Sequence, residues 1–235
     1  MNTRSDAWNA SYERGENYAF YPKEETVKFL NRSIRKRTGI ETFRDILTPP
    51  PGRTRLRGLD FGCGIGRHVA LFEEFGVEAH GVEISTASLD VARRLLAAAG
   101  QTAAIDRLRL VDGESPLPFE AGYFDFATAC GVLDSMPFAL ARRCVGELDR
   151  VVRSTLFVDL ISGDDSNHHR EFAGETVVET PHERDTIQSY FNFERVRELF
   201  AGTRFEIRSA RLMTEQSLTE RFRYSRYHVT LEKRR

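Results

Sequence analysis

The residues with the clearest chemical meaning are three alternate glycines after a short apolar segment. Residues 56–66 read Leu-Arg-Gly-Leu-Asp-Phe-Gly-Cys-Gly-Ile-Gly, so Asp60 stands two residues before Gly62. An apolar run, a glycine turn and an amphipathic segment predict a buried strand, a tight turn and a helix. Glycine is required where the backbone takes unusual dihedral angles or a ligand lies against the main chain. We therefore expect a ligand site here, since ligands bind at the carboxyl edge of α/β sheets.

The spacing of the glycines distinguishes between classes of ligand-binding turn. A dinucleotide-binding turn has the pattern G-x-G-x-x-G/A, whose third position here is Arg67, with Gly66 one residue early. A phosphate-binding loop ends in Gly-Lys-Ser/Thr, and no such ending follows this turn. The remaining pattern, D-x-G-x-G-x-G, resembles motif I of the class I, Rossmann-like S-adenosylmethionine-dependent methyltransferases, in their small-molecule type (methyltransferase domain 11/25-like).

Glu83 is a second candidate, because it lies near the end of an apolar-leaning run over residues 78–84. The run suits the second strand of a βαβ unit, where a carboxylate can accept hydrogen bonds from both ribose hydroxyls. A solvated acid at a strand end is the alternative. Nicotinamide-binding and adenosylmethionine-binding folds both use an acid here, so Glu83 indicates an adenosine-type ligand without choosing between them. We expect Ile84 to contact the same ligand.

The segment over residues 107–114 helps to choose between a nicotinamide-binding and an adenosylmethionine-binding fold. It alternates polar and apolar residues and ends in acids. It resembles the acidic-loop segment of the family, in which an aspartate accepts from the adenine amino group and the next backbone amide meets the ring. The resemblance assigns these roles to Asp112 and Gly113, with Glu114 beside them. Asp-Gly is also a common turn pair, so a simple loop is the alternative.

A central buried strand is predicted within residues 123–133, which read Tyr-Phe-Asp-Phe-Ala-Thr-Ala-Cys-Gly-Val-Leu. This segment is similar to the family's FD-hydrophobic run, whose end, here Cys130 and Gly131, lies beside the methionine part of the cofactor. The four segments occur in the family's order from about residue 56 to residue 162. The resemblance therefore implies S-adenosyl-L-methionine as cofactor and S-adenosyl-L-homocysteine as product.

Further cofactor contacts are implied around the glycine turn and in the amino-terminal segment. His68 starts the next helix, so its imidazole either approaches the cofactor carboxylate or only caps the helix, and Arg67 is similarly placed. The expected cofactor-binding residues are Tyr12, Tyr21, Asp60, Gly62, Cys63, Gly64, Arg67, His68, Glu83, Ile84, Asp112, Gly113, Glu114, Cys130 and Gly131.

The amino-terminal segment is unusually aromatic, and Trp8 and Tyr12 are spaced for one face of a helical turn. Resemblance to the family suggests a lid that closes over cofactor and substrate and excludes water. Simple packing of an extra helix on the sheet is the alternative. We assign residues 1–47 to an amino-terminal helical cap or lid.

Asp134 is a candidate on the acceptor side, because it follows the 123–133 strand. Nucleic-acid methyltransferases usually have an Asn/Asp-Pro-Pro-Tyr motif here, which this chain lacks. Many small-molecule members have a histidine near this position, so Asp134 departs from the pattern. It is a base, a substrate acceptor, or a cap for the helix that begins around Phe138.

A polar insertion over residues 162–190 holds His168, His169 and His182. Such loops often carry substrate specificity, so substrate contact, base duty and a solvated loop all remain open. No metal site is expected, because adjacent histidines point apart and no further ligands recur at useful spacing. The catalytic residue is unknown; the candidates are Asp134, His168, His169 and Tyr21.

The elements that must position these residues alternate between strand and helix from Leu56 onward. Such alternation predicts a doubly wound, mostly parallel α/β sheet. The resemblance implies seven strands in the order 3-2-1-4-5-7-6, closed by an antiparallel carboxyl-terminal hairpin, in a core over residues 53–235. We expect strands near 56–61, 78–83, 107–111, 123–129 and 155–161, helices near 66–75, 86–99, 138–150 and 193–200, and hairpin strands over 203–213 and 220–231.

Two local details accompany this organisation. A helix opens after Pro22, carries Arg35, Lys36 and Arg37 in its last turn and ends at Gly39. In the last strand, Phe222 and Tyr224 are in step with each other but out of phase with Tyr227 and the apolar residues that follow it, so a bulge near 225–226 is predicted.

The composition bounds the functional class. The chain has 235 residues, a net charge of −1 and three cysteines, an odd number without metal-type pairing. No large cationic field for nucleic acid is evident, and the cysteine usage favours a reducing, cytoplasmic setting. No secretory signal or membrane-spanning run is expected.

These observations lead to one functional expectation with two alternatives. We expect a methyltransferase that transfers a methyl group to oxygen or nitrogen of a small-molecule acceptor by in-line displacement. A non-catalytic adenosylmethionine-binding subunit and an NAD-dependent oxidoreductase are the alternatives. The acceptor, any general base, the pathway and the oligomeric state are not indicated by the sequence.

Overall fold

The computed structural model describes residues 4–164, 172–181, 183–220 and 222–234. A central sheet has the strand order β10-β11-β7-β6-β3-β4-β5, with β3 to β7 parallel and β11 antiparallel to both neighbours. Counted along the core, this is the expected order 3-2-1-4-5-7-6, so the predicted fold class is confirmed. The strands are β3 (Arg57–Phe61), β4 (Glu78–Glu83), β5 (Leu108–Leu110), β6 (Phe124–Cys130), β7 (Val152–Ile161), β10 (Phe205–Gln216) and β11 (Arg223–Lys233).

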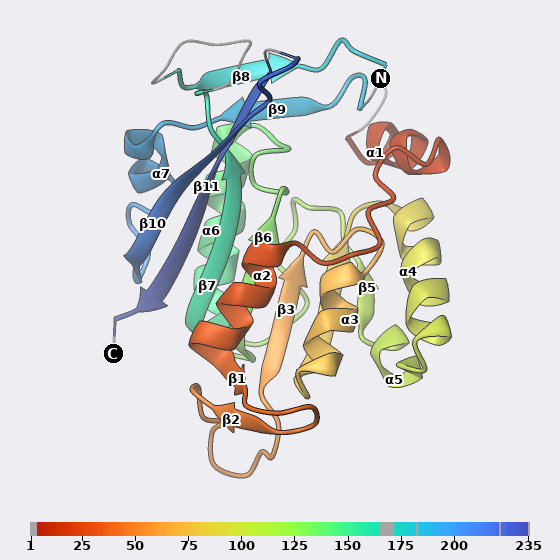
Figure 1. Cartoon of the computed structure of the whole chain (residues 1–235), viewed down its shortest axis with the longest axis vertical. Helices are drawn as coiled ribbons and strands as arrows, with labels where there is room; N and C mark the ends of the chain where they lie inside the picture. The colour runs from red at the N-terminus through yellow and green to blue at the C-terminus, as the bar shows by residue number, and fades with distance from the viewer. Residues whose placement is uncertain (1–3, 165–171, 182, 221, 235) are drawn as a thin grey trace.

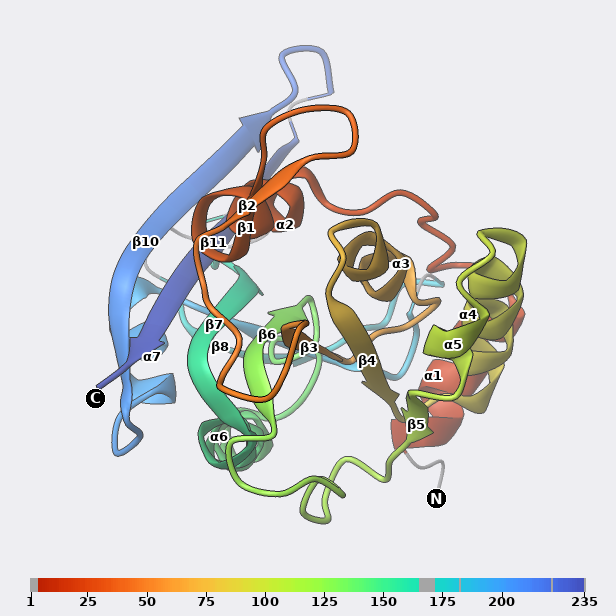
Figure 2. The ribbon, with the colours of Figure 1, turned by 90° about the horizontal axis from the view of Figure 1, so that it is seen from below.

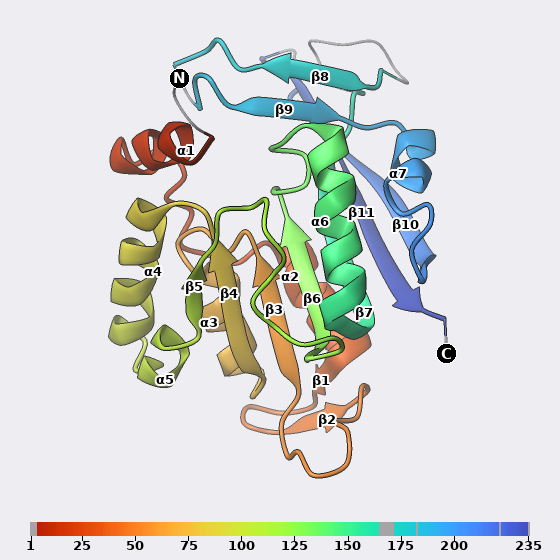
Figure 3. The same cartoon turned by 180° about the vertical axis from the view of Figure 1, so that it is seen from behind.

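Helices cover both faces of this sheet. The near face in Figure 1 carries α2 (Glu24–Phe29) and α3 (Arg67–Glu74), and the far face, seen in Figure 3, carries α6 (Phe138–Val151). Towards the β5 edge lie α4 (Thr86–Ala98) and α5 (Thr102–Ile105), and α7 (Phe193–Leu199) flanks the hairpin edge (Figure 2). Two apolar clusters, one on each face, therefore hold the strand ends in fixed positions.

Local sequence explains why the central elements begin where they do. The strands β3 and β6 are buried almost throughout, as expected for parallel strands covered on both faces. The side chain of Ser85 accepts a hydrogen bond from the Ser88 amide and so caps α4. Asn192 caps α7 in the same way through the Arg195 amide.

The segment after α2 differs from the prediction. The helix continues only as a π-helical turn, Leu30–Ile34, and Arg35–Arg37 forms strand β1, antiparallel to β2 (Phe43–Asp45). The expectation that these basic residues fill a last helical turn ending at Gly39 is therefore wrong. Arg35 donates to the Phe75 carbonyl at 2.6 Å and lies over the Phe43 ring, so tertiary contacts outweigh helix propensity here.

The irregularity of the closing hairpin lies in β10, whereas the prediction placed it in β11. The register shifts between Ile207 and Ser209 in β10, whereas β11 runs without a break. Ser225 is fully buried, in step with Tyr227 and Val229, and Phe222 is half exposed. The predicted bulge near 225–226 is therefore wrong, because a small polar residue occupies the buried position that the prediction reserved for an aromatic one.

Two segments lie over the carboxyl ends of the parallel strands. One is helix α1 (Arg4–Glu13); the other is a separate two-stranded sheet of β8 (Gly174–Val177) and β9 (Ile187–Tyr190), as Figures 1 and 3 show. Within the described residues, no helix is long and apolar enough to cross a membrane.

Candidate functional site

The glycine turn after β3 is a cradle that side chains would fill. Gly62 and Gly64 have φ angles of +72° and +51°, in the left-handed region that favours glycine. A Cβ atom on Gly62 would lie 2.4 Å from the Val132 side chain, and one on Gly64 would lie 2.6 Å from the Tyr12 hydroxyl. The backbone therefore passes directly beneath the end of β6 and beneath α1.

Glu83, at the end of β4, is bonded to this turn. Its Oε2 accepts the Gly64 amide at 2.9 Å, and its Oε1 accepts the amides of Ile84 at 2.7 Å and Ser85 at 3.1 Å. Burial raises the pKa of the Glu83 carboxyl, although the three backbone hydrogen bonds favour the ionised form. The glycine turn and the strand-end acid are thus in contact.

Asp60 supports the turn from below. Its Oδ1 accepts the Thr128 hydroxyl at 2.7 Å, and among the described residues no donor reaches its buried Oδ2. The imidazole of His68 has Nδ1 3.6 Å from Asp60 Oδ1 and accepts the Lys23 amide at Nε2, at 3.3 Å. His68 therefore links the start of α3 to the segment before α2.

Glu83 lines a small pocket of about 70 Å³ at the carboxyl ends of β3 and β4. Arg4, Trp8 and Tyr12, spaced four apart on α1, form one wall of the pocket. Burial, followed by the Glu83 carboxylate, raises the pKa of the Tyr12 hydroxyl well above its ordinary value. The predicted aromatic face of a helix is therefore present, and the Tyr12 hydroxyl is a hydrogen-bond donor rather than a base.

Asp112 lies outside this pocket. Its Oδ1 accepts the amides of Glu114 at 2.8 Å and Ser115 at 2.7 Å, and its Oδ2 accepts the Ser115 hydroxyl. These hydrogen bonds lower the pKa of Asp112 to about 2. The carboxylate is committed to its own turn, whereas Gly113 lines the pocket. Glu114 is exposed and lines a neighbouring groove.

A larger chamber of about 580 Å³ adjoins the pocket. It lies between the glycine turn, the end of β6, residues 15–19 and the β8–β9 connection, and it shares Gly62 and Gly131 with the pocket. The carboxylate of Glu16 accepts the Glu183 amide at 2.9 Å and so joins the two roof segments. The expected cofactor-binding residues that line the pocket or the chamber are Tyr12, Gly62, Cys63, Gly64, Arg67, His68, Glu83, Ile84, Gly113, Cys130 and Gly131.

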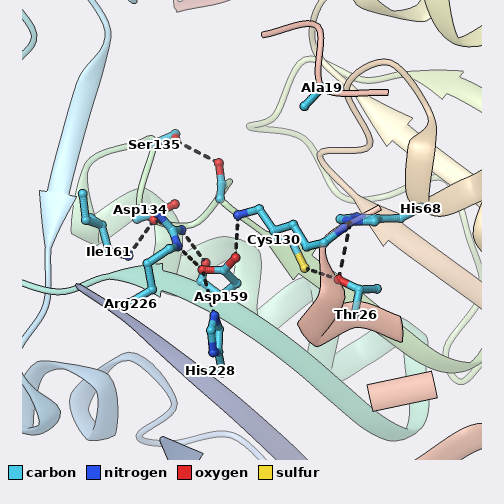
Figure 4. Close-up of polar contacts among 12 residues, drawn as sticks. Ala19, Thr26, His68, Cys130, Asp134, Ser135, Asp159, Ile161, Arg226 and His228 are labelled. Carbon is cyan, nitrogen blue, oxygen red and sulfur yellow. Dashed lines mark hydrogen bonds and ion pairs between the residues drawn. The ribbon is translucent and has the colours of Figure 1, made fainter. Parts of the chain in front are cut away.

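Four charged side chains form one cluster at the chamber wall (Figure 4). Arg226 on β11 lies between two carboxylates: it is ion-paired with Asp159 on β7 and donates to Asp134 Oδ2 at 2.6 Å. Lys23 Nζ lies 2.5 Å from the other oxygen of Asp159. Burial alone would raise the pKa of Asp159, but Arg226 and Lys23 hold it well below its ordinary value.

One oxygen of the Asp134 carboxylate, Oδ2, accepts two hydrogen bonds. Its Oδ2 also accepts the Ile161 amide at 2.7 Å, and no donor among the described residues reaches its buried Oδ1. The N-cap of α6 is Pro137, with no side-chain hydrogen bond. The capping alternative is therefore wrong, and Asp134 remains a candidate for the acceptor side.

Of the other catalytic candidates, Tyr21 lies within the described residues. The side chain of Tyr21 is 87% exposed and lines neither cavity, so its expected contact with the cofactor is not seen. The two candidates His168 and His169, and also His182, fall outside the described residues. Within the described ranges, no three potential ligands are grouped as a metal site would require.

Sequence reasoning missed Lys23, Asp159, Arg226 and Tyr224, which all belong to the chamber wall or support it. One signal was available: Asp159 interrupts the apolar run from Leu156 to Ile161, and a charge within a buried strand needs a partner. The partners lie near the two ends of the chain, and their spacing carries no local signal.

Comparisons with known proteins agree with the fold. Residues 59–155 match the family model described as a methyltransferase domain. No curated protein matches the chain by sequence. A likeness below 25% identity establishes a shared fold, and three solved structures share it over most of the chain.

The first is an S-adenosylmethionine-dependent methyltransferase from Methanosarcina mazei, with 20% identity, coverage of 77% of this chain and 93% of that chain, and a TM-score of 0.62. The second is magnesium protoporphyrin IX methyltransferase from Synechocystis PCC 6803 with bound S-adenosylmethionine, with 14% identity, coverage of 100% and 85%, and a TM-score of 0.54. The third is the cyclase SpnF, with 16% identity, coverage of 97% and 92%, and a TM-score of 0.62.

Proposed function

We propose that this chain, a class I, Rossmann-like methyltransferase by fold with a methyltransferase domain at residues 59–155, methylates oxygen or nitrogen of a small molecule. One observation carries the proposal: a glycine turn bonded to a strand-end carboxylate opens into both a narrow pocket and a wide chamber. A two-substrate reaction needs such a pair of adjoining spaces. The cofactor belongs in the pocket and the acceptor in the chamber.

The residues present fit S-adenosylmethionine. Glu83 has an Oε2 with a single amide partner, which leaves it able to accept from a ribose hydroxyl. The buried, unpartnered Oδ2 of Asp60 is an acceptor beneath the glycine turn. We assign the ribose to Glu83, the adenine to the pocket wall that contains Ile84 and Gly113, and the methionine part to Gly62–Gly64 and Gly131.

When bound, S-adenosylmethionine supplies a methyl group on a positively charged sulfur, which an acceptor atom displaces in line. The chain has to orient that acceptor and keep water away from it. The α1 helix and the β8–β9 sheet lie over the site for this purpose, joined by the Glu16 contact to the Glu183 amide. Burial raises the pKa of the Cys130 thiol to about 12 and that of the Cys63 thiol well above its ordinary value, which disfavours their nucleophilic thiolate forms.

The chamber suits a small molecule. Its volume of about 580 Å³ is within the range of small-molecule sites, about 300–1,000 Å³. Its wall is polar, with charged side chains of both signs, and the net charge of the chain is −1, so there is no broad cationic field for nucleic acid. Asp134 is the proposed polar contact on the acceptor side.

Calorimetry separates the proposal from its alternatives. We expect binding of S-adenosylhomocysteine and none of NAD; the reverse result would favour an oxidoreductase. A labelled-methyl assay against metabolite pools then tests catalysis. Tight binding of S-adenosylhomocysteine with no methyl transfer to any pool would instead indicate a non-catalytic subunit.

A further inference from the structure

We infer that Lys23 binds the methyl acceptor beside Gly131, and that this acceptor is an oxygen acid, namely a phenol, an enol or a carboxylic acid. The inference rests on the proposed function and narrows it from oxygen or nitrogen to oxygen. It depends on which charged groups face the place where the pocket meets the chamber.

Gly131 marks this place. It follows the last residue of β6, has a φ of +69°, and lines both the pocket and the chamber. A cofactor in the pocket and an acceptor in the chamber therefore come together beside it. Gly131 has no side chain, so its neighbours across the open space decide the local charge.

The side chains nearest to Gly131 across the open space are the cations Lys23 and Arg226. The position that a Cβ on Gly131 would take lies 3.7 Å from Lys23 Nζ and 3.8 Å from Arg226 Nη2. Apart from Gly131 itself and its chain neighbours Cys130 and Val132, no other heavy atom of the described residues lies within 4 Å of that position. An acceptor atom beside Gly131 would meet positive charge first.

The carboxylates that balance these cations are more buried than Lys23, although Asp134 also lines the chamber. The side chains of Asp159 and Asp134 are 1% and 4% exposed, whereas that of Lys23 is 30% exposed. Arg226 Nη2 is already bonded to Asp134 Oδ2 and to the Asp159 carbonyl. Lys23 has three donor hydrogens and one bond to Asp159, so it has donors free for a ligand. Lys23 is thus the catalytic residue, and Arg226 and Asp159 are positioning residues.

Other charged or titratable groups around the chamber do not reverse this local charge. At the roof, Glu16 is paired with Arg14 at 2.6 Å and bonded to the Glu183 amide, which commits its carboxylate. The charged or titratable groups that face Lys23 or the chamber from neighbouring elements are Tyr12 on α1, Glu16, Tyr18 and Glu183 at the roof, Cys63 in the glycine turn, Arg67 and His68 on α3, Cys130 on β6, Asp134 after β6, Asp159 on β7, and Tyr224, Arg226 and His228 on β11.

Charge decides between the two kinds of acceptor. A neutral amine becomes a cation as it gains a methyl group, and Lys23 and Arg226 would repel that charge. An oxyanion is attracted by the same cations, which favour ionisation of the acidic hydroxyl. The acceptor oxygen loses its proton to water and then supplies the electron pair of the new C–O bond, while the pair of the broken C–S bond stays on sulfur, which becomes a neutral thioether.

The first test uses 4-nitrophenol as an acceptor probe, because only its ionised form absorbs strongly in the visible. Its absorbance is titrated with pH in the presence of excess full-length protein saturated with S-adenosylhomocysteine. We expect the ionisation midpoint to fall by about one pH unit on binding, a tenfold preference for the phenolate. Lys23→Met should abolish the shift and Lys23→Arg should retain part of it.

A matched control is Lys28→Met, which removes a lysine of α2 that pairs with Glu24 and Glu25 and does not line the chamber. It should leave the midpoint shift intact. An unshifted midpoint in the wild type, no binding of the probe, or an equal shift in Lys23→Met would overturn the inference. Calorimetry with S-adenosylhomocysteine on each variant shows whether the cofactor site is intact, so a failure of the proposed function is recognised separately.

The second test sorts the products of the labelled-methyl assay. O-methyl ethers and esters of acids pass through a cation exchanger at acidic pH, whereas methylated amines are retained. We expect the label in the flow-through. Retained label would overturn the choice of oxygen while leaving the methyltransferase function intact; no labelled product with any pool would remove both.

Discussion

Glu83 Oε2 accepts the backbone amide of Gly64 at 2.9 Å, so the acid at the end of β4 and the turn after β3 form one unit. The parallel register brings this about, because Phe61 is the partner of Val82 and the two chains leave the sheet side by side. The same carboxylate orders the backbone and faces the pocket. Changes at Glu83 should therefore affect ligand binding directly.

Glu83→Ala should weaken the binding of S-adenosylhomocysteine by about 1.5–3 kcal/mol, the range for losing hydrogen bonds to a charged group. Isothermal titration calorimetry measures this. Glu78→Gln is the matched control, since Glu78 begins the same strand and pairs with Arg57 at the opposite end. Equal affinity in Glu83→Ala and the wild type would show that the ribose assignment is wrong.

The affinity for S-adenosylhomocysteine should also depend on pH through Glu83. Burial raises the pKa of Glu83, and the protonated carboxyl loses acceptor capacity, so affinity should fall as the pH is lowered. The fall should begin above the ordinary glutamate pKa of about 4.3. Calorimetry from pH 8 downward measures it, and Glu83→Gln should give a flatter profile. Parallel profiles for both proteins would assign the dependence to another group.

Gly64→Ala should disturb α1 as well as the turn. The new Cβ would lie 2.6 Å from the Tyr12 hydroxyl, in addition to a left-handed backbone strain of about 1–2 kcal/mol. Gly100→Ala is the control for strain alone, since Gly100 has a φ of +72° and nothing within 4 Å of its Cβ position. Urea unfolding and calorimetry should show a larger loss for Gly64→Ala.

A second substitution isolates the effect of the contact between the new Cβ at position 64 and the Tyr12 hydroxyl. Tyr12→Phe removes the hydroxyl that the alanine would meet, so the double variant should recover part of the affinity lost by Gly64→Ala. Strict additivity of the two changes would mean that α1 already avoids the clash without cost.

Asp159→Asn should lower the free energy of unfolding by about 3 kcal/mol, because it removes one partner from a buried charge cluster. Urea unfolding at pH 7 tests this. Asp90→Asn is the control, since Asp90 pairs with Arg93 on the exposed face of α4 and its loss should change little. Similar losses for the two variants would contradict the proposed importance of the cluster.

The difference in the free energy of unfolding between the wild type and Asp159→Asn should also depend on pH. The pKa of Asp159 is lower in the folded than in the unfolded chain, so its stabilisation is fully present above the unfolded value of about 3.9. It is lost as the pH falls from there through the folded value. The difference in stability between the wild type and Asp159→Asn should therefore shrink below about pH 4.

Patterns within short segments predicted most of the fold. The glycine turn, the acid at residue 83 and the buried strand at residues 124–130 each have a local signature, and the strand order follows from their alternation together with the family resemblance. An error arose where a local signal competed with tertiary contacts. Arg35 is drawn to Phe43 and Phe75 instead of continuing a helix.

The charge cluster could not be predicted in the same way. Lys23, Asp159 and Arg226 come from three distant parts of the sequence, and only the sheet topology makes β7 and β11 neighbours. Asp159 was the one recognisable member, as a charge inside an apolar run. Tyr21 illustrates the converse: an aromatic residue in a suggestive segment whose side chain faces solvent.

Lys23 and Arg226 both pair with the Asp159 carboxylate, so this part of the chamber wall can form only after both segments have been synthesised. Strands β3, β4 and β6 can emerge from the ribosome and pair while the last hairpin is still untranslated. A nascent chain at that stage would already have its nucleoside cradle, but the wall that receives the second substrate would lack its arginine. Competence for the reaction should therefore arise only after β11, which follows the cradle strands in the chain, has been translated and has paired with β7.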